Sequence, residues 1–169
     1  MKWTGARYTD KPTVEVRTWI DAPPERVWAL VSDVGRMPGL SDELQSVEWL
    51  DGATTPAVGA RFLGRSRHEA LGDWSTTSYV IEYEPGRVFA WAVEDPADPS
   101  AVWRFRLHAG DGGTELSEWV QLGPGPSGLS VAIGRMPDKE EKIVFVRLRE
   151  FERNMTATLE RIKRLAETG

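Results

Sequence analysis

The C-terminal segment, residues 138–166, has the clearest pattern of hydrophobic and polar positions in the chain. At 100° per residue its main apolar side chains fall on one arc about 120° wide, which is typical of an amphipathic helix packed on a core. This stripe comprises Val144, Leu148, Phe151, Met155, Thr158, Leu159, Ile162 and Leu165, and the opposite face carries Lys142, Arg149, Arg153, Glu160 and Lys163. At 1.5 Å per residue the helix would be about 43 Å long, so we expect it to cross a whole sheet.

The beginning of this helix has a different character. Pro137, with Asp138 and Glu140 in the first turn, fits a helix start, where a fixed φ and negative charge are favoured. The next four residues after the first turn, 143–146, are apolar all the way round. Such an end must be covered on more than one side or must border an apolar opening. Two interpretations stay open: residues 123–137 fold over it, or it borders a ligand cavity or a partner surface.

The chain begins with a polar stretch, residues 1–12, which predicts an arm or an early edge strand. Residues 13–21 then alternate between apolar and polar side chains, which predicts a half-buried strand. A helix follows, in which Asp21 could cap the start, two prolines fit the first turn and Gly35 can end the helix. Residues 36–42 predict a turn or a second short helix.

Six further strands are predicted at residues 44–51, 58–68, 73–84, 87–94, 101–109 and 113–122. Asp-Gly and Pro-Gly pairs at residues 51–52, 85–86 and 111–112 are strong turn signals between them. Short strands linked by turns are most simply neighbours in an antiparallel sheet. The glycine- and proline-rich residues 123–137 predict a loop before the long helix, with a short helix at residues 129–135.

This order of elements predicts an α+β fold. A highly curved, seven-stranded antiparallel sheet would wrap around the long C-terminal helix, with two short helices after the first strand. The 169 residues suit one domain of ordinary size, and no linker or repeat divides them. We therefore expect residues 1–169 to form a single domain.

Alternation along each strand separates an inner face from an outer one. The inner sets are Phe62, Gly64, Ser66 and His68; Trp74, Thr76, Ser78 and Val80; Phe89, Trp91 and Val93; Trp103, Phe105 and Leu107; and Leu116, Glu118, Val120 and Leu122. The set that begins at Trp74 is the least defined, because the other face of that strand is apolar too. These sets place one carboxylate, Glu118, and one imidazole, His68, among apolar side chains.

Three stretches of the chain resemble polyketide cyclase/dehydrase-like proteins, which belong to the helix-grip (SRPBCC) superfamily with START lipid-transfer domains and the birch-pollen allergen fold. They are VEVRTWIDAPPERVWALVSDVGRMPGLS, VGARFLGRSRHEALGDWSTTSYVIEYEPGRVFAWAV and GGTELSEWVQL. The resemblance covers about residues 13–166 and consists of apolar positions and turns, without a catalytic signature. It implies a helix-grip fold with an apolar cavity between sheet and helix, which binds lipids, polyketides, steroids or other hydrophobic molecules. Residues 123–137 depart from the shortest family pattern.

Glu118 and His68 are the candidate catalytic residues. A carboxylate in an apolar pocket is costly unless it is paired, and its pKa tends to rise. A Glu–His pair could perform general acid–base chemistry on a carbonyl-bearing ligand. The alternatives are that Glu118 joins an internal hydrogen-bond network and that His68 lies at a solvent-exposed strand end. The candidate ligand-binding residues are Phe62, Trp74, Ser78, Trp91, Trp103, Phe105, Val144, Leu148 and Phe151.

Charge and composition exclude several classes of function. The net charge of −5 gives no electrostatic case for nucleic acid or an anionic membrane, and no apolar run is long enough for a membrane span. Without cysteine there is no disulfide framework or thiol nucleophile. Two histidines with scattered acids lack a metal-binding spacing, and the glycine-rich runs lack the context of a phosphate cradle. We therefore expect no metal, no cofactor and a cytoplasmic location.

Three functions are compatible with these features. The leading hypothesis is a protein that binds a hydrophobic small molecule in an internal cavity. The second is an enzyme of the cyclase, aromatase or dehydratase type that uses Glu118 and His68 as acid and base. The third is an interaction module, such as a homodimer or a partner of another protein, that uses Phe145, Val146 and residues 123–137.

Overall fold

The computed structural model describes residues 1–169 and contains a seven-stranded antiparallel sheet in the order β1-β7-β6-β5-β4-β3-β2. The strands are β1 (Thr13–Ile20), β2 (Leu44–Trp49), β3 (Arg61–His68), β4 (Gly72–Glu84), β5 (Val88–Val93), β6 (Ala101–Gly110) and β7 (Gly113–Leu122). From β2 to β7 each strand pairs with the next in the chain, and β1 pairs with β7 at the edge. The predicted strands are confirmed; the largest difference is in β3, which begins at Arg61 instead of residue 58.

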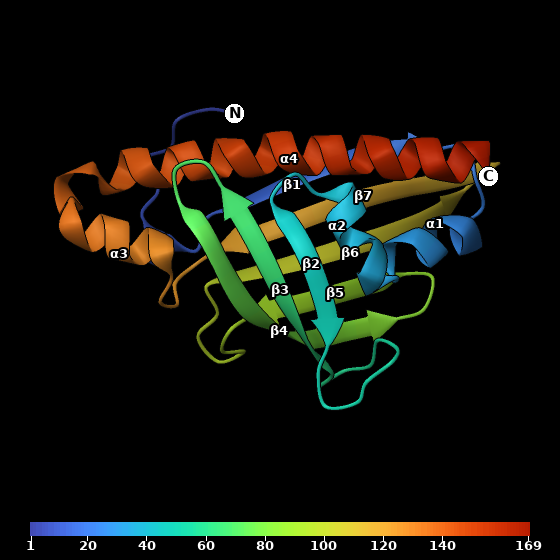
Figure 1. Cartoon of the computed structure of the whole chain (residues 1–169). Helices are drawn as coiled ribbons and strands as arrows, with labels where there is room; N and C mark the ends of the chain where they lie inside the picture. The colour runs from blue at the N-terminus through green and yellow to red at the C-terminus, as the bar shows by residue number, and fades with distance from the viewer.

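Four helices and three short 3₁₀ turns complete the fold. The helices are α1 (Pro24–Val31), α2 (Met37–Leu40), α3 (Gly128–Arg135) and α4 (Glu140–Thr168), and the 3₁₀ turns are η1 (Tyr8–Asp10), η2 (Val34–Arg36) and η3 (Pro137–Lys139). Figure 1 shows α4 lying across the sheet, with α1 and α2 towards one end of it and α3 at the other. This is the helix-grip architecture that the sequence predicts.

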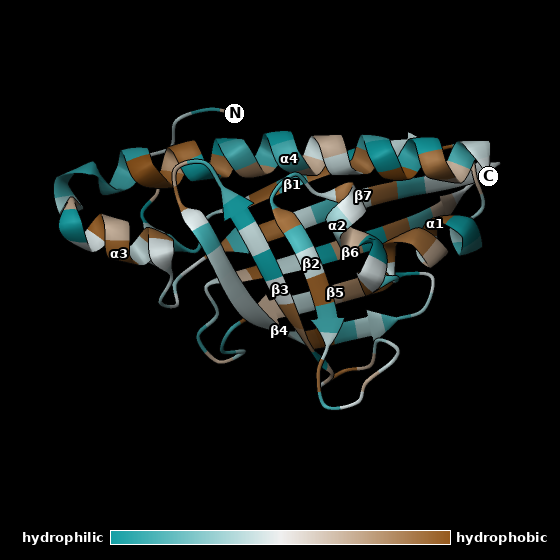
Figure 2. Cartoon of the chain, viewed as in Figure 1, coloured by the Kyte–Doolittle hydropathy of each residue, from teal (hydrophilic) through white to brown (hydrophobic).

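The buried face of α4 is the predicted apolar stripe, with one error at its end. Figure 2 shows hydrophobic positions recurring along the helix between hydrophilic ones. Leu165 is 46% exposed, whereas Ala166 is fully buried. The prediction for Leu165 is therefore wrong, because Ala166 is the residue that faces α1 and joins the core cluster shared by α1 and α4.

The connection after β1 also differs from the prediction. Asp21 does not cap α1: the cap position is Pro23, and Asp21 instead accepts a hydrogen bond from Trp19 Nε1 at 2.9 Å. The helix ends at Val31 and not at Gly35. The Ser32 hydroxyl donates to the Trp28 carbonyl at 2.7 Å, and this bond satisfies a carbonyl of the last turn.

The apolar start of α4 is covered from two sides. Ile133 of α3 belongs to the same core cluster as Val144, in agreement with the first of the two interpretations left open by the sequence. The N-terminal arm covers another side, which the sequence did not predict: Trp3 packs edge-on against Phe145, with ring centroids 5.0 Å apart. Val146 is the member of this run that stays largely open, at 45% exposure.

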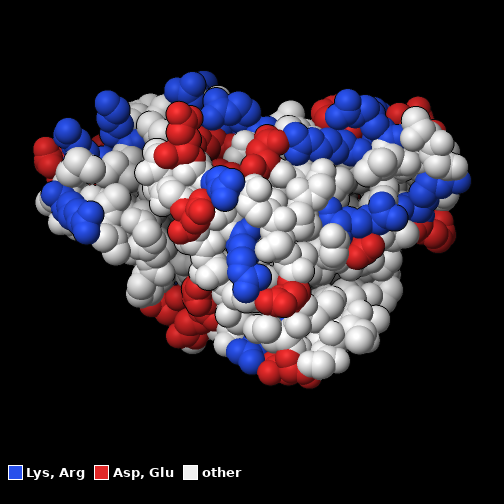
Figure 3. Space-filling view, in the orientation of Figure 1, with Lys and Arg blue, Asp and Glu red and all other residues white.

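The outer face of α4 carries charges of both signs. Figure 3 shows basic and acidic side chains interspersed along this face of the molecule, without a block of one sign. The predicted pair of Lys163 and Glu167 is present, with Nζ 2.9 Å from the carboxylate. None of the helices combines the length and apolar composition that crossing a bilayer requires.

Candidate ligand-binding cavity

A cavity of about 630 Å³ lies between the inner face of the sheet and the helices α2, α3 and α4. Of the 36 residues that line it, 19 are hydrophobic, so the wall is mainly apolar with a minority of polar groups. Both the volume and this composition are typical of small-molecule sites, which range over about 300–1,000 Å³. We refer to it as the main cavity.

Seven of the predicted ligand-binding residues line the main cavity: Phe62, Trp74, Ser78, Trp91, Trp103, Phe105 and Phe151. The strand register explains this, because inward residues of neighbouring strands lie directly opposite each other. Trp91 pairs with Trp103, and Phe62 pairs with Ser78. Phe151 of α4 packs edge-on against Trp103, with ring centroids 5.1 Å apart, and closes the cavity over this aromatic wall. Contact of these residues with a ligand stays a prediction.

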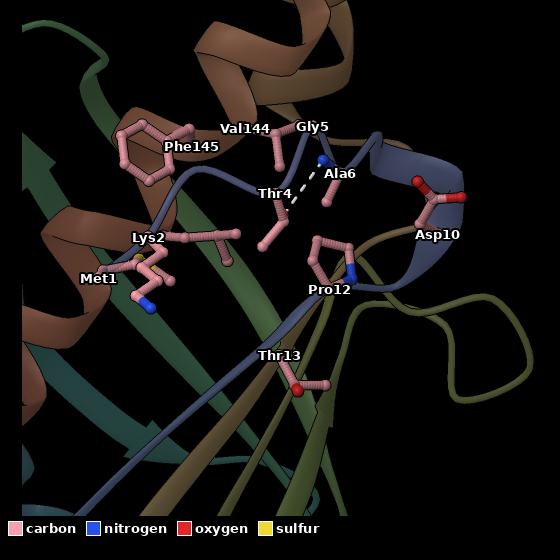
Figure 4. Close-up of a pocket in the computed structure, with 11 residues that line it drawn as sticks. Met1, Lys2, Thr4, Gly5, Ala6, Asp10, Pro12, Thr13, Val144 and Phe145 are labelled. Carbon is pink, nitrogen blue, oxygen red and sulfur yellow. Dashed lines mark hydrogen bonds between the residues drawn. The ribbon is translucent and has the colours of Figure 1, made fainter.

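The other two predicted residues, Val144 and Leu148, do not border the main cavity. They line a separate hollow of about 290 Å³ between α4 and the N-terminal arm. Figure 4 shows the arm running around this hollow, with Val144 and Phe145 of α4 beside it and Pro12 on its other side. This turn of α4 packs into the core cluster that contains Val120 and Leu122 of β7, and its other side borders the hollow next to the beginning of β1.

Glu118 lies on the inner face of β7, lines the main cavity and is 6% exposed. Its in-register neighbours are Val16 on β1 and Phe105 on β6. Its Oε2 is the one fully buried side-chain nitrogen or oxygen without a hydrogen-bond partner. Burial raises the pKa of Glu118 to about 8 from an ordinary value of 4.5, because the charged form loses its solvation. The alternative of an internal network is therefore wrong, and the carboxyl is mostly neutral at pH 7.

Further polar groups of the wall have no protein partner. Three such groups are the indole N–H groups of Trp91 and Trp103 and the hydroxyl of Ser78, which make no hydrogen bond within the protein. Each of these atoms keeps some accessible surface, because Glu118 Oε2 is the one atom that is both fully buried and unpaired. These residues all lie on the inner face of the sheet, so the groups are open towards the main cavity. The cavity thus offers a ligand both donors and acceptors, since a hydroxyl group can act as either.

His68 lies far from Glu118 in the sheet. It ends β3, which β4, β5 and β6 separate from β7, and it does not line the main cavity. Its Nδ1 accepts hydrogen bonds from the N–H groups of Ala70 and Leu71 at 2.9 and 3.1 Å. The ring proton is therefore on Nε2, which donates to Glu150 of α4. The predicted acid–base pair is not formed, and the side chain is not an open strand end either, since it is only 15% exposed.

An ion-pair network at the rim of the main cavity was not predicted from the sequence. Arg147 of α4 donates hydrogen bonds of 2.8 and 2.7 Å to the two carboxylate oxygens of Glu43, and Asn154 donates a third at 3.0 Å. The Arg147 guanidinium also lies 3.8 Å from Glu150 and 4.6 Å from the centre of the Phe151 ring. This network fastens α4 to the segment that leads into β2. The feature of the sequence that could have indicated this network is Arg147 itself, a single arginine within an otherwise apolar turn of the predicted helix.

The same region contains a group of potential metal ligands. Glu43, His68 and Glu150 place ligand atoms within 4.8 Å of one another. However, the Arg147 guanidinium already pairs with both carboxylates, and the His68 nitrogen that faces them carries its proton. A cation at this position would have to displace both, so these residues fit an ion-pair network and do not fit a metal site.

Known proteins share this sequence pattern and fold. A family model described as polyketide cyclase / dehydrase and lipid transport matches residues 11–167. The solution structure of a polyketide-cyclase-like protein from Corynebacterium glutamicum is 31% identical, with a TM-score of 0.65, over 92% of this chain and 91% of that one. A search of curated proteins finds no match.

Two more distant structures share the fold. A protein from Deinococcus radiodurans is 22% identical, with a TM-score of 0.63, over 94% of this chain and 99% of that one. The di-domain ARO/CYC protein of the steffimycin biosynthetic pathway is 12% identical, with a TM-score of 0.70, over 92% of this chain and 50% of that one. At these identities the likeness concerns the fold alone.

Proposed function

The chain belongs to the polyketide cyclase / dehydrase and lipid transport family, and from this premise we propose that it binds a hydrophobic small molecule in the main cavity. The observation that carries the proposal is a volume of about 630 Å³ walled by Trp91, Trp103, Phe105 and Phe151. Protein interiors are normally close-packed, so a hollow of this size among aromatic side chains indicates space kept for a ligand. Lipids and polyketides are the ligand classes that the family description suggests.

The arrangement of polar groups suggests how a ligand would be held. Apolar side chains, aromatic rings among them, form just over half of the lining residues, and polar groups that include the Glu118 carboxyl lie between them. Such a wall binds mainly through burial of apolar surface, and its polar groups fix the orientation of the ligand. The ion pair of Arg147 and Glu43 at the rim holds α4 in place over the bound molecule.

A cavity-filling substitution tests the proposal. Ser78 is 4% exposed and its side chain points into the main cavity, so Ser78→Phe should occupy the space of the ligand. The matched control is Thr77→Phe, on the outer face of the same strand, where Thr77 pairs with Leu63. Binding of the neutral probe N-phenyl-1-naphthylamine is measured by fluorescence, and co-purified ligands by native mass spectrometry.

We expect the wild type and Thr77→Phe to bind the probe and Ser78→Phe to lose binding by about tenfold or more, since the new ring occupies space beside Trp91 in which the probe would pack. Circular dichroism confirms that each variant is folded. Equal binding by Ser78→Phe and the wild type would show that the probe sits elsewhere, and the proposal would fail.

A second candidate is a cyclase- or dehydratase-type reaction in the same cavity. The observation in its favour is Glu118, a neutral carboxylic acid at pH 7 that has a proton to donate to a carbonyl or hydroxyl oxygen. Glu118→Gln separates the two candidates: it preserves shape and removes the acid. Conversion of a polyketide-like substrate by the wild type, together with binding without conversion by this variant, would favour catalysis.

Association of two chains stays a prediction. The apolar run at the start of α4 is mostly internal, because Val144 is fully buried and Phe145 lies beneath Trp3. Val146 alone offers a large exposed apolar surface in this run. Light scattering over a range of concentrations measures the mass, and a doubling that Val146→Asp abolishes would support a dimer through this surface.

A further inference from the structure

Glu118 has no structural role that explains a carboxyl group at its position. It forms no hydrogen bond or ion pair, and one of its oxygens is fully enclosed without a partner. A buried carboxyl without partners is costly, and a leucine or glutamine would fill the same place at lower cost. A group of this kind is expected where it serves a ligand, and this one lines the main cavity.

Aromatic side chains share the main cavity with Glu118. Phe105 lies beside it in register on β6, and Trp91, Trp103 and Phe151 line the same cavity. Trp91 and Phe105 have ring centroids 6.0 Å apart, so these rings form a continuous surface. The faces of aromatic rings attract cations, and most strongly where water is excluded. One ring of this wall already does so, since the Arg147 guanidinium lies 4.6 Å from the centre of Phe151.

The chain supplies no cation to Glu118. The charged groups that line the main cavity with it are Glu43, Glu94, Arg135 and Arg147. Arg147 pairs with Glu43 and Glu150. Arg135 is exposed on α3 and does not contribute to the pKa of Glu118.

The strands beside β7 bring no counter-charge either. Arg104 and Arg106 lie on the outer face of β6, and from β1 the in-register neighbour of Glu118 is Val16. Burial alone raises the pKa of Glu118, without a contribution from any neighbouring charge. In its charged form this carboxylate could therefore be paired only by a cation that a ligand brings into the cavity.

We propose that the main cavity takes a hydrophobic amine, whose ammonium group pairs with the Glu118 carboxylate between the rings of Trp91, Trp103 and Phe105. This inference rests on the proposed function and names the ligand class. On binding at pH 7, the Glu118 carboxyl releases its proton to solvent and the ammonium keeps its own, so an ion pair forms and one proton appears in solution. No covalent bond to carbon forms or breaks.

A neutral ligand with a carbonyl group is the competing chemistry. It would accept one hydrogen bond from the protonated Glu118 and release no proton. The two ligands also differ in their dependence on pH. Amine binding strengthens as the pH rises towards 8, because less work is needed to deprotonate Glu118, whereas carbonyl binding weakens as the donor is lost.

Three naphthalenes of similar size test the inference by isothermal titration calorimetry: 2-(aminomethyl)naphthalene, 2-acetylnaphthalene and 2-ethylnaphthalene. Titrations of the amine in phosphate and in Tris at pH 7 give the number of protons released. We expect the amine to bind about tenfold more tightly than 2-ethylnaphthalene at pH 8, with release of about one proton at pH 7. Glu118→Gln should remove this preference and keep affinity for 2-ethylnaphthalene, and Glu115→Gln, on the outer face of β7, should change neither.

The possible outcomes distinguish the inference of an amine ligand from the proposed function of hydrophobic-ligand binding. Binding of 2-ethylnaphthalene without a preference for the amine, or a preference for 2-acetylnaphthalene without proton release, would overturn this inference and leave the proposed function standing. Binding of none of the three would overturn both. The proton count on the wild type decides the matter even if Glu118→Gln fails to fold.

Discussion

Replacing Glu118 with glutamine is expected to stabilise the protein at neutral and alkaline pH, although most substitutions of buried residues destabilise. Glu118 is 6% exposed and has no hydrogen-bond partner, so the isosteric amide loses no contact. Folding raises the pKa of this carboxyl from 4.5 to about 8. The folded state therefore holds the proton more tightly than the unfolded chain, and rising pH favours unfolding through this group.

The sign and size of the effect follow from this change in pKa. Below about pH 4.5 the carboxyl is protonated in both states, and its contribution to stability is complete. Between pH 4.5 and 8 the wild type loses about 1.4 kcal/mol per pH unit through Glu118, and above pH 8 the loss levels off near 5 kcal/mol. Between about pH 4.5 and pH 7 the stability of the glutamine variant relative to the wild type should therefore rise by about 3 kcal/mol.

Urea unfolding followed by tryptophan fluorescence measures this difference at pH 5, 7 and 8.5. The control is Glu115→Gln, which removes the same charge from the outer face of β7. We expect the advantage of Glu118→Gln to grow steadily with pH and that of Glu115→Gln to stay small. A difference that does not change with pH, or a Glu118→Gln variant that is less stable than the wild type at pH 8.5, would refute the reasoning.

Three further predictions concern the contacts of α4 and of the N-terminal arm. Leu159→Ala should cost about 2–5 kcal/mol of unfolding free energy because Leu159 is 2% exposed, whereas Leu165→Ala should cost under about 0.5 kcal/mol; equal costs in urea unfolding would contradict the packing of α4. A double-mutant cycle with Arg147→Gln and Glu43→Gln should give a coupling of about 1–3 kcal/mol, since Arg147 is 9% exposed; a coupling near zero would mean that the pair does not fasten the helix. Tyr8→Phe should cost about 1 kcal/mol through the 2.7 Å bond to the Gly125 carbonyl, and an unchanged midpoint in urea would count against a docked arm.

The fold was predictable from the sequence because its signals are local and periodic. Turn pairs such as Asp51-Gly52 separate the strands, and the stripe from Val144 to Ile162 defines the buried face of α4. Alternation along the strands also assigns Trp91, Trp103 and Glu118 to the inner face of the sheet, and all three line the main cavity. A strand has a side-chain period of two, and one anchored residue therefore orients all the others.

The errors fall where the outcome depends on tertiary contacts. The sequence predicted that His68 ends its strand and lies on an inner face, but no local pattern could show that this strand end lies beside α4, across the sheet from Glu118. The pairing of Arg147 with Glu43 joins residues 104 positions apart, which no local pattern encodes. Val144 belongs to the correct stripe, yet the arm and not the main cavity lies against its turn of the helix.

The most direct test of a ligand cavity between the sheet and α4 is a titration observed at the tryptophan indole N–H resonances by ¹⁵N–¹H correlation spectroscopy. Trp91 and Trp103 line the main cavity, whereas Trp19 and Trp119 point outward from β1 and β7. With N-phenyl-1-naphthylamine as the ligand, the account predicts that the resonances of Trp91 and Trp103 shift and saturate together while those of Trp19 and Trp119 stay in place. Unmoved cavity resonances, or equal shifts at all four, would contradict it.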